Sequence, residues 1–584
     1  MALQAKENNG TAPPNNKNDN DNDNNNNPPG DGEQPYTEYR NNADKVLNFR
    51  IDATATATTC HEQIQEIVEV LCPFLLLSDN NNDDRSGSSS SIHLPFQIKP
   101  LTGGLSNHLF LVSNDSNSTV LVRIHPDANE TEDDALDANE TENETTTAST
   151  SGTSTNTFSI VDRDSEPKFA AWLASQQLNS SSSSNSSNNN NSNANLAPTV
   201  YGRFLNGRVE EFYDNVRPLA WAEMKRYAPW IAQRLASFHS LGGGSSSNSN
   251  SCSNSCSSSG NDEITTAIDA TPPPPDVLPR PTTSAATVYE MLESWFHEAR
   301  ATSQKREATA AGNDANDSNN NDDDDADEMV LFLNQLSSEW AWLEKELTNL
   351  PPPLQQQQST TDDDDDKSIV AEALSFIRRV TVTHMDCQPL NILIGNNYQY
   401  NDYENENIAH GSDNQLRLID FEYAGWNPIA ADIANTFCEY CEMSNLCADY
   451  DKEYPTPAQQ DVFFWNYLLH SDPIRAKKFS SYSRRTMQQM KTETQNPGVS
   501  SNRNDDDDDK EWNLFSTTLQ QEVGRFSLLS HLGWAVWSIL KRQEQDGVDF
   551  DYMAYARHRM DGYAWAKKRF IVVAAGEATA TAAS

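Results

Sequence analysis

Two polar motifs in the second half of the chain carry residues that could support phosphoryl transfer. Asp386 lies in a polar turn after a β-branched run, and Asn391 follows it five residues later. Asp420 ends a second apolar run at 416–419. A carboxylate can orient a hydroxyl and accept its proton, while an amide oxygen and a second carboxylate hold the Mg²⁺ that bridges ATP phosphates. Either motif alone would more often cap a turn, but together they predict a catalytic Asp386 and a magnesium site at Asn391 and Asp420.

An upstream glycine-containing segment and a nearby arginine could serve the nucleotide phosphates. Residues 102–107 read Thr-Gly-Gly-Leu-Ser-Asn between two expected strands. Glycines let backbone N–H groups approach phosphate oxygens closely, although two glycines also suit an ordinary turn. Arg123 lies inside the apolar run 119–124, where a buried guanidinium requires a partner. The candidate phosphate-contacting residues of the loop are Thr102, Gly103, Gly104, Ser106 and Asn107.

Three aromatic residues near the C-terminal end could form a binding surface for a cation. Trp534 and Trp537 lie three residues apart and share one helix face. Tyr555 lies on the following segment. Aromatic faces attract ammonium groups, but this spacing is also typical of a helix packed into a core.

Much of the charge lies outside the segments that could position these residues. The chain has 584 residues, with 42 basic and 86 acidic side chains and a formal net charge of −44. Acidic tracts without aromatic residues bury too little apolar surface to offset the entropy lost on ordering. We therefore expect such tracts to be disordered. The most acidic stretches are 127–144, 314–328, 362–366 and 505–509.

The remaining sequence is long enough for one two-lobed enzyme with insertions in its surface loops. The predicted organisation is a disordered tail at 1–36, a first lobe at 37–216, a second lobe at 217–572 and a flexible segment at 573–584. Disordered inserts are expected in the first lobe at 79–91, 127–157 and 179–195. Those expected in the second lobe are 243–281, 308–328, 355–367, 398–414 and 491–510.

Hydrophobic patterning between the inserts predicts an α+β fold. The first lobe contains two expected helices, at 61–77 and 165–177, and several short strands. A strand–turn–strand is expected at 96–112, a strand at 119–124 and a hairpin at 201–212, turned by Asn206-Gly207. The second lobe is expected to be larger and mainly helical, with helices at 219–241, 287–302, 328–349 and 368–379 and a strand-rich segment at 380–394 and 416–420.

Composition also excludes several classes of protein. A polyanionic chain without a basic stripe is a poor candidate for nucleic-acid binding, and no apolar run is long enough to span a membrane. The N-terminal residues lack the apolar core of a signal peptide. Eight cysteines give no disulfide framework in a chain of this length. We therefore expect a cytoplasmic protein with reduced thiols and no stable membrane insertion.

The order of several motifs resembles the choline/ethanolamine kinase family. The pattern His384-x-Asp386-x4-Asn391, followed by the segment 419–424 (Ile-Asp-Phe-Glu-Tyr-Ala), carries most of the resemblance. Segments 102–107, 120–124 and 161–166 resemble the family's phosphate loop, its arginine-bearing strand and the start of the helix whose glutamate pairs with that arginine. Segments 432–439 and 530–537 resemble the family's later helices. The resemblance implies a bilobal protein-kinase-like fold and an alcohol phosphotransferase that uses ATP and Mg²⁺.

The resemblance also implies roles for individual residues. Asp386 would position and deprotonate the acceptor hydroxyl, while His384 would hold the catalytic loop. Asn391 and Asp420 would bind Mg²⁺, with Glu422 a ligand for a second ion. Nucleotide binding would fall to the loop 102–107 and an Arg123–Glu166 pair. An aromatic box of Trp534, Trp537 and Tyr555, with Glu439 nearby, would bind the acceptor's cationic head group.

The head group itself is not fixed by the sequence. The Asp162–Glu166 element resembles the ethanolamine branch, whereas Cys387-Gln388 and Phe437-Cys438 look closer to the choline branch. A primary ammonium offers N–H donors, while a trimethylammonium has none. We favour ethanolamine, whose product would enter phosphatidylethanolamine synthesis, with choline as the alternative.

Two other readings and two departures from the family pattern remain. A kinase for another small alcohol would require a more polar pocket, and a non-catalytic kinase-like interaction protein would not require the intact set of Asp386, Asn391 and Asp420. Met385 stands where the family usually has Asn, and Leu390 where Gly is common. Both could lower the rate. The sequence leaves the oligomeric state open, a homodimer included.

Overall fold

The computed structural model describes fifteen parts of the chain, which fall into two compact units. One unit contains the described residues up to Asp214 except Leu196, and the other contains Leu196 and the residues from Asn215 onward. The described residues are 46–53, 55–76, 96–101, 108–114, 118–125, 165–176, 196–242, 272–282, 284–312, 322–348, 362–396, 416–441, 446–479, 507–544 and 550–572.

The first unit is built on a six-stranded sheet with the strand order β1-β5-β6-β4-β3-β2. The strands are β1 (Val46–Leu47), β2 (Gln97–Leu101), β3 (His108–Ser113), β4 (Thr119–Ile124), β5 (Val200–Phe204) and β6 (Gly207–Glu211). Only the β1–β5 pairing is parallel, and the other neighbours are antiparallel. This order places β4 and β6 side by side, with Arg123 directly opposite Arg208.

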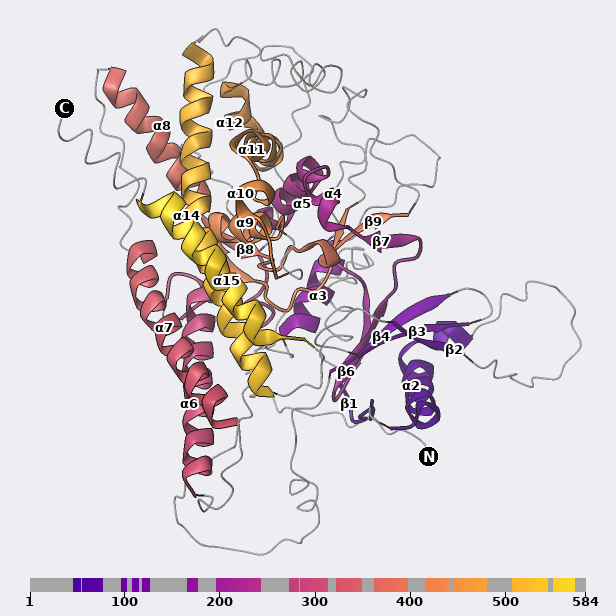
Figure 1. Cartoon of the computed structure of the whole chain (residues 1–584). Helices are drawn as coiled ribbons and strands as arrows, with labels where there is room; N and C mark the ends of the chain where they lie inside the picture. The colour runs from indigo at the N-terminus through magenta and orange to yellow at the C-terminus, as the bar shows by residue number, and fades with distance from the viewer. Residues whose placement is uncertain are drawn as a thin grey trace, which may run out of the picture. The chain divides into compact units, whose positions relative to one another are not determined.

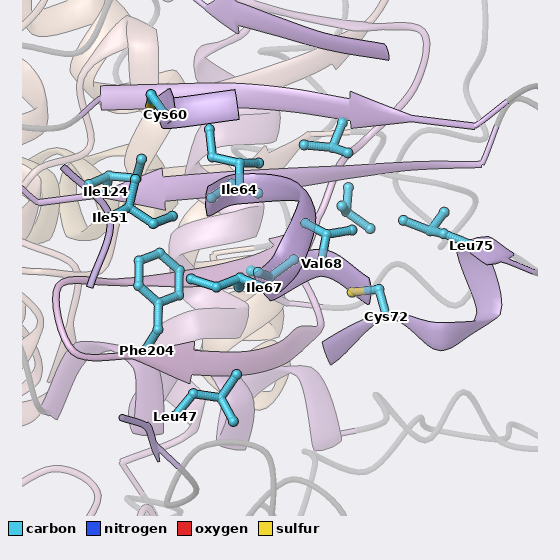
Figure 2. Packing of buried hydrophobic residues seen from close by; sticks show 14 residues of the cluster. Leu47, Ile51, Cys60, Ile64, Ile67, Val68, Cys72, Leu75, Ile124 and Phe204 are labelled. Carbon is cyan, nitrogen blue, oxygen red and sulfur yellow. The ribbon is translucent and has the colours of Figure 1, made fainter. Parts of the chain in front are cut away.

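The helix α2 (Ala57–Leu71) covers one face of this sheet and is followed by the 3₁₀ turn η1 (Pro73–Leu76). Its buried residues recur at helical spacing, at Cys60, Ile64, Ile67 and Val68. They pack against the alternating apolar residues of the strands, as Figure 2 shows. Asn206, in the β5–β6 turn, bonds to both the N–H and the carbonyl of Ile51, which ties the N-terminal segment to the hairpin.

The other helix of this unit is α3 (Ser165–Ser175), whose first turn contains Glu166. Both α3 and the β5–β6 hairpin lie where the sequence predicted them, within a few residues. Gly207 begins β6, and a side chain there would collide with the Arg123 carbonyl and the Phe204 ring. The chain reverses at Leu205-Asn206, one position before the predicted Asn206-Gly207 turn, and Gly207 permits the close approach of β6 to β4.

The second unit carries short strands between helices. The strands are β7 (Val216–Pro218), β8 (Val380–Thr383), β9 (Ile392–Gly395), β10 (Arg417–Leu418) and β11 (Gly425–Pro428), and η3 (Pro389–Asn391) precedes β9. They form the ladders β10-β9-β7 and β11-β8. β9 and β10 are antiparallel, and so are β8 and β11.

Helices make up the rest of the second unit (Figure 1). They are α4 (Trp221–Met224), α5 (Ala228–Ser240), α6 (Thr287–Gly312), α7 (Asp322–Thr348), α8 (Asp362–Ile377), α9 (Ile429–Cys438), α10 (Tyr450–Glu453), α11 (Pro457–Ser471), α12 (Pro473–Lys478), α14 (Asp507–Glu544) and α15 (Tyr552–Lys567), followed by η6 (Lys568–Val572). The long α14 packs against α15, α9 and α8. The α+β class with a small sheet unit and a larger helical unit is as predicted.

Several helices extend into segments that were predicted to be disordered inserts. α6 continues to Gly312, and α7, α8 and α14 begin within acidic runs, at Asp322, Asp362 and Asp507. Aspartates at a helix N-terminus are stabilised by the helix dipole, and adding turns to an existing helix costs far less than nucleation. The other predicted inserts lie mostly outside the described residues. No helix in the described part of the chain is both long and apolar enough to cross a bilayer.

Candidate active site

A short loop between β8 and β9 brings the side chains of Asp386 and Asn391 into contact. Asn391 Nδ2 donates to the Asp386 carboxylate at 2.6 Å and to the Asp386 carbonyl at 3.0 Å. Gln388 Nε2 donates to the same carboxylate oxygen at 3.2 Å. Both Asp386 and Asn391 are buried. The five-residue spacing therefore brings the carboxylate and the amide into direct contact.

The strand pairing places Asp420 at the same end of a ladder as Asn391. In the β9–β10 pair Leu418 lies opposite Ile392, so Asn391 precedes one strand where residues 419–420 follow the other. The Ile419 N–H donates to the Asn391 carbonyl at 3.1 Å. Asp420 has a φ of 69°, which turns the chain directly after the strand. The predicted amide and carboxylate thus come from neighbouring strand ends.

The atoms available here suit a hard divalent cation. Asn391 directs its amide nitrogen to Asp386, and its Oδ1 makes no hydrogen bond within the described residues. Asp420 and Glu422 are both near enough to Asp386 for their charges to raise its pKa. No three His, Cys, Asp or Glu side chains of the described residues make a cation site by themselves. Oxygen ligands are what Mg²⁺ prefers, so the Asn391 Oδ1 and the carboxylates of Asp420 and Glu422 are the candidate ligands.

Asp386 lies in an environment that opposes its ionisation. Burial raises the pKa of its carboxyl well above the ordinary value, and the negative charges of Glu439, Asp420 and Glu422 raise it further. Perturbation of this kind, produced by burial together with named neighbouring charges, is typical of functional carboxyl groups. A cationic ligand at this position would favour the ionised form.

The side chain of His384 holds the loop that carries Asp386 and Asn391. Its Nδ1 accepts the Asp386 N–H at 3.2 Å, so Nε2 carries the proton and donates to the Ile419 carbonyl at 3.1 Å. Burial lowers the pKa of His384, which keeps the ring neutral. His384 therefore joins the loop to the segment before Asp420, consistent with the supporting role that the sequence suggested.

A second buried acid, Asp432 in the first turn of α9, holds the start of the loop. Its two oxygens accept the N–H groups of His384 and Met385, each at 2.8 Å, and Oδ2 also contacts His239 Nε2 at 2.8 Å. Met385 has a φ of 63°, in the left-handed region. Asn tolerates this conformation better than Met. The departure at Met385 therefore places a less suitable residue at a strained position, whereas Leu390 is half-exposed.

In the first unit, Glu166 forms its ion pair with an arginine that the sequence interpretation did not assign. Arg208 donates to both Glu166 oxygens at 2.6 Å and to Glu210 at 2.6 Å. Arg123 lies 3.4 Å from Glu210. The predicted partner of Glu166 was Arg123, and that pairing stays a prediction. Because Arg123 and Arg208 are opposite each other on β4 and β6, both face the same side of the sheet, and α3 presents Glu166 to Arg208.

The remaining predicted nucleotide residues lie outside the described part of the chain. These are Thr102, Gly103, Gly104, Ser106 and Asn107. The loop joins β2 and β3, which pair antiparallel from Leu101 and Leu109 onward. Its role stays a prediction.

Two of the predicted aromatic residues, Trp534 and Trp537, meet around Tyr423, which the sequence interpretation had not included as a site residue. Trp534 lies 5.2 Å from Tyr423 and 5.5 Å from Trp537, measured between ring centroids, and both contacts are edge-to-face. Trp537 Nε1 donates to the Tyr423 hydroxyl at 2.7 Å, and Trp534 Nε1 donates to Asn435 at 2.8 Å. Burial raises the pKa of Tyr423, as do the charges of Glu422 and Asp386. The cluster therefore lies beside the catalytic loop.

Glu439 and Tyr555 are joined by a buried arginine. Arg559 Nη2 contacts Glu439 Oε1 at 2.5 Å and the Tyr555 hydroxyl at 2.7 Å. Glu439 follows α9 directly, and Tyr555 and Arg559 lie one turn apart on α15. The sequence offered no signal for Arg559 or Arg208 beyond charged residues in otherwise apolar segments, and Asp432 entered only as the first residue of the segment 432–439 in the family resemblance.

Comparison with known proteins identifies the family of this chain. A family model described as choline/ethanolamine kinase matches residues 173–564. A probable ethanolamine kinase of Nematostella vectensis is 29% identical over 175 residues, which cover 30% of this chain and 41% of that protein. Probable choline kinase 2 of Arabidopsis thaliana is 28% identical over 210 residues, covering 34% and 49%. The matched region thus spans less than half the length of these curated relatives.

Solved structures of related proteins cover more of the chain at lower identity. A choline kinase of Cryptosporidium parvum gives a TM-score of 0.45 at 18% identity, covering 87% of this chain and 97% of that one. A Plasmodium vivax ethanolamine kinase gives a TM-score of 0.46 at 17% sequence identity, covering 92% of this chain and 95% of that one. The family model itself extends over well over half of the sequence and includes Asp386, Asn391, Asp420 and the aromatic residues. The chain belongs to the choline/ethanolamine kinase family.

Proposed function

We propose that the protein is an ATP-dependent ethanolamine kinase. Asp386 would take the proton of the ethanolamine hydroxyl as its oxygen bonds to the γ-phosphorus of ATP. The bond between the γ-phosphorus and the β–γ bridging oxygen breaks, which yields phosphoethanolamine and ADP. The product would serve phosphatidylethanolamine synthesis, and we expect the reaction in the cytoplasm.

The observation that carries this proposal is the Asp386–Asn391 contact within a loop held by His384 and Asp432. Asn391 binds both the carboxylate and the carbonyl of Asp386, which limits the rotation of either side chain. Holding a general base in a fixed position is the main contribution a protein can make to a phosphoryl transfer that depends on positioning and charge.

Roles in nucleotide and metal binding are proposed for individual residues of each unit. Asn391 Oδ1 and Asp420 would bind Mg²⁺, with Glu422 a ligand to a second ion. When bound, the metal would neutralise charge on the phosphates. Arg123 and the loop 102–107 would contact the phosphates, and Glu166 would act through Arg208, its partner in the structure.

Ethanolamine is favoured as the acceptor because a buried carboxylate lies near the aromatic cluster. Glu439 raises the pKa of Asp386 by its charge, so it lies close to the reacting end. A carboxylate accepts the N–H donors of a primary ammonium, which a trimethylammonium lacks. Choline is the second candidate, because Tyr423, Trp534 and Trp537 provide aromatic faces that attract any ammonium. Relatives carry both names.

The test is an ATP- and Mg²⁺-dependent phosphorylation assay on the full chain, with ethanolamine and choline at matched concentrations. We expect a higher kcat/KM for ethanolamine. A higher kcat/KM for choline would make choline the preferred substrate and leave the kinase assignment unchanged. If only another small alcohol is phosphorylated, neither ethanolamine nor choline is the acceptor. Turnover of none would contradict the catalytic proposal and favour a non-catalytic kinase-like protein.

A further inference from the structure

Within the described residues, every side-chain hydrogen bond of Arg559 goes to a residue that the family resemblance assigned to the acceptor substrate. Nη2 contacts Glu439 Oε1 and the Tyr555 hydroxyl, and Nε donates to the same hydroxyl at 2.9 Å. The guanidinium carbon lies 5.1 Å from the Tyr555 ring centroid and 5.9 Å from that of Trp534. Arg559 is 1% exposed and Glu439 is 4% exposed. A fixed cation therefore lies within the cluster expected to bind a substrate cation.

Stability alone accounts poorly for this arrangement. Removing two charges from water costs about as much as a buried ion pair returns. Arg559 Nη1 has no hydrogen-bond partner among the described residues, which adds the cost of an unsatisfied buried donor. A guanidinium held in this way is better suited to fixing the positions of its two partners than to stabilising the fold.

The contact with Arg559 determines which oxygen of Glu439 remains available to a ligand. Arg559 occupies Oε1, while Oε2 makes no hydrogen bond within the described residues. A buried carboxylate that lost its cationic partner would turn away from this position, because an isolated buried charge is costly. We propose that Arg559 is a positioning residue that holds the Glu439 carboxylate in place through Oε1 and leaves Oε2 to accept an N–H of the acceptor's ammonium group. This inference rests on the proposed function and makes Arg559 a determinant of head-group selectivity.

The experiment compares the full-length wild type with Arg559→Met, Arg559→Lys and Glu439→Gln. For each protein, KM and kcat are measured for ethanolamine, and choline is assayed as a substrate or as a competitive inhibitor. The matched control is Arg557→Met, on the same helix, whose ion pair with Glu328 is exposed. We expect Arg559→Met to raise the KM for ethanolamine tenfold or more, with kcat changed less than threefold and the choline constant changed less than threefold.

The conservative and double variants separate positioning from a general loss of structure. Arg559→Lys keeps the positive charge and should restore part of the affinity for ethanolamine, also if Arg559→Met fails to fold. The double variant Arg559→Met/Glu439→Gln should be no worse than Glu439→Gln alone, because Arg559 acts through Glu439. Arg557→Met should leave both constants unchanged.

The proposal is overturned if Arg559→Met or Arg559→Lys changes the KM for ethanolamine and the choline constant by the same factor. It is also overturned if the substitution lowers kcat alone or leaves all of these constants unchanged. Additive effects of the two substitutions would overturn it as well. These outcomes all require an active wild type. An inactive wild type would instead contradict the proposed kinase function, so the two failures are distinguishable.

Discussion

The carboxylate of Asp432 accepts the main-chain N–H of His384 at 2.8 Å, although the two residues are 48 positions apart in the sequence. The same carboxylate accepts the N–H of Met385 and contacts His239. The loop that carries Asp386 is therefore anchored at its first two residues by a side chain from the start of α9. The geometry of this loop therefore depends on a buried acid outside the set of proposed catalytic residues.

Replacing Asp386 with Asn should remove the general base and leave the nucleotide contacts in place. We expect kcat to fall by about 10³-fold or more, because a positioned base contributes about 10²–10⁴. The affinity for a non-hydrolysable ATP analogue should change less than about threefold, since uniform binding is unaffected. Asp449→Asn is the control, because Asp449 is exposed and pairs only locally with Lys452. Wild-type turnover by Asp386→Asn would exclude this residue as the base.

Asp432→Asn should reduce stability most at neutral pH and least in acid. Burial raises the pKa of Asp432, but bonds from His239 and the His384 amide outweigh it, and the net pKa lies below the ordinary value of 3.8. A carboxyl with a lowered pKa contributes stability above its ordinary pKa and loses it as the pH falls through the folded value. The loss at pH 7 should be about 3 kcal/mol.

Urea denaturation of both proteins across the acid range checks this expectation. The difference between wild type and Asp432→Asn should shrink as the pH drops below 3.8, the ordinary pKa. A difference that stays constant with pH would show that Asp432 contributes as a hydrogen-bond acceptor alone.

At position 385 the backbone conformation should decide which substitutions are tolerated. β-Branched residues are strongly disfavoured at positive φ, whereas Asn is enriched there. We expect Met385→Val to be less stable than Met385→Asn by about 1 kcal/mol or more, and to have the lower kcat. At Met553, a buried position of helix α15, the order should reverse, because there Asn would bury an amide. Thermal unfolding of the four variants gives the comparison, and the same order at both positions would rule out a role for φ.

The ion pairs of Arg208 and Arg217 have similar N···O distances but differ in burial, so they test how burial changes the contribution of an ion pair to stability. Arg208 contacts Glu166 at 2.6 Å and Arg217 contacts Glu223 at 2.7 Å, both as two-pronged pairs, but the Arg217 side chain is 39% exposed and that of Arg208 is 2%. Arg208→Met leaves Glu166 and Glu210 buried without their shared cation, and should cost about 3–5 kcal/mol.

Arg217→Met should cost less than about 1 kcal/mol, because its pair is screened by solvent. Chemical denaturation followed by tryptophan fluorescence measures both variants. Equal losses would mean that the network of Arg208, Glu166 and Glu210 contributes no more than a surface pair.

The sequence by itself determined which residues could do chemistry and the elements that carry them. Asp386, Asn391 and Asp420 are readable because residue type, local spacing and the ends of apolar runs are local properties. The same holds for the β5–β6 hairpin and for the two tryptophans on one face of α14. The order of these motifs also sufficed to identify the family.

Only the tertiary structure decided which distant partners meet. Glu166 pairs with Arg208 because strand register sets Arg208 opposite Arg123, and register follows from the packing of the whole sheet. Asp432 and Arg559 act across 48 and 120 positions, and many charged residues could have filled those roles. The helices entering acidic runs were missed for a related reason. Their stability comes from packing along the rest of each helix, which local composition does not contain.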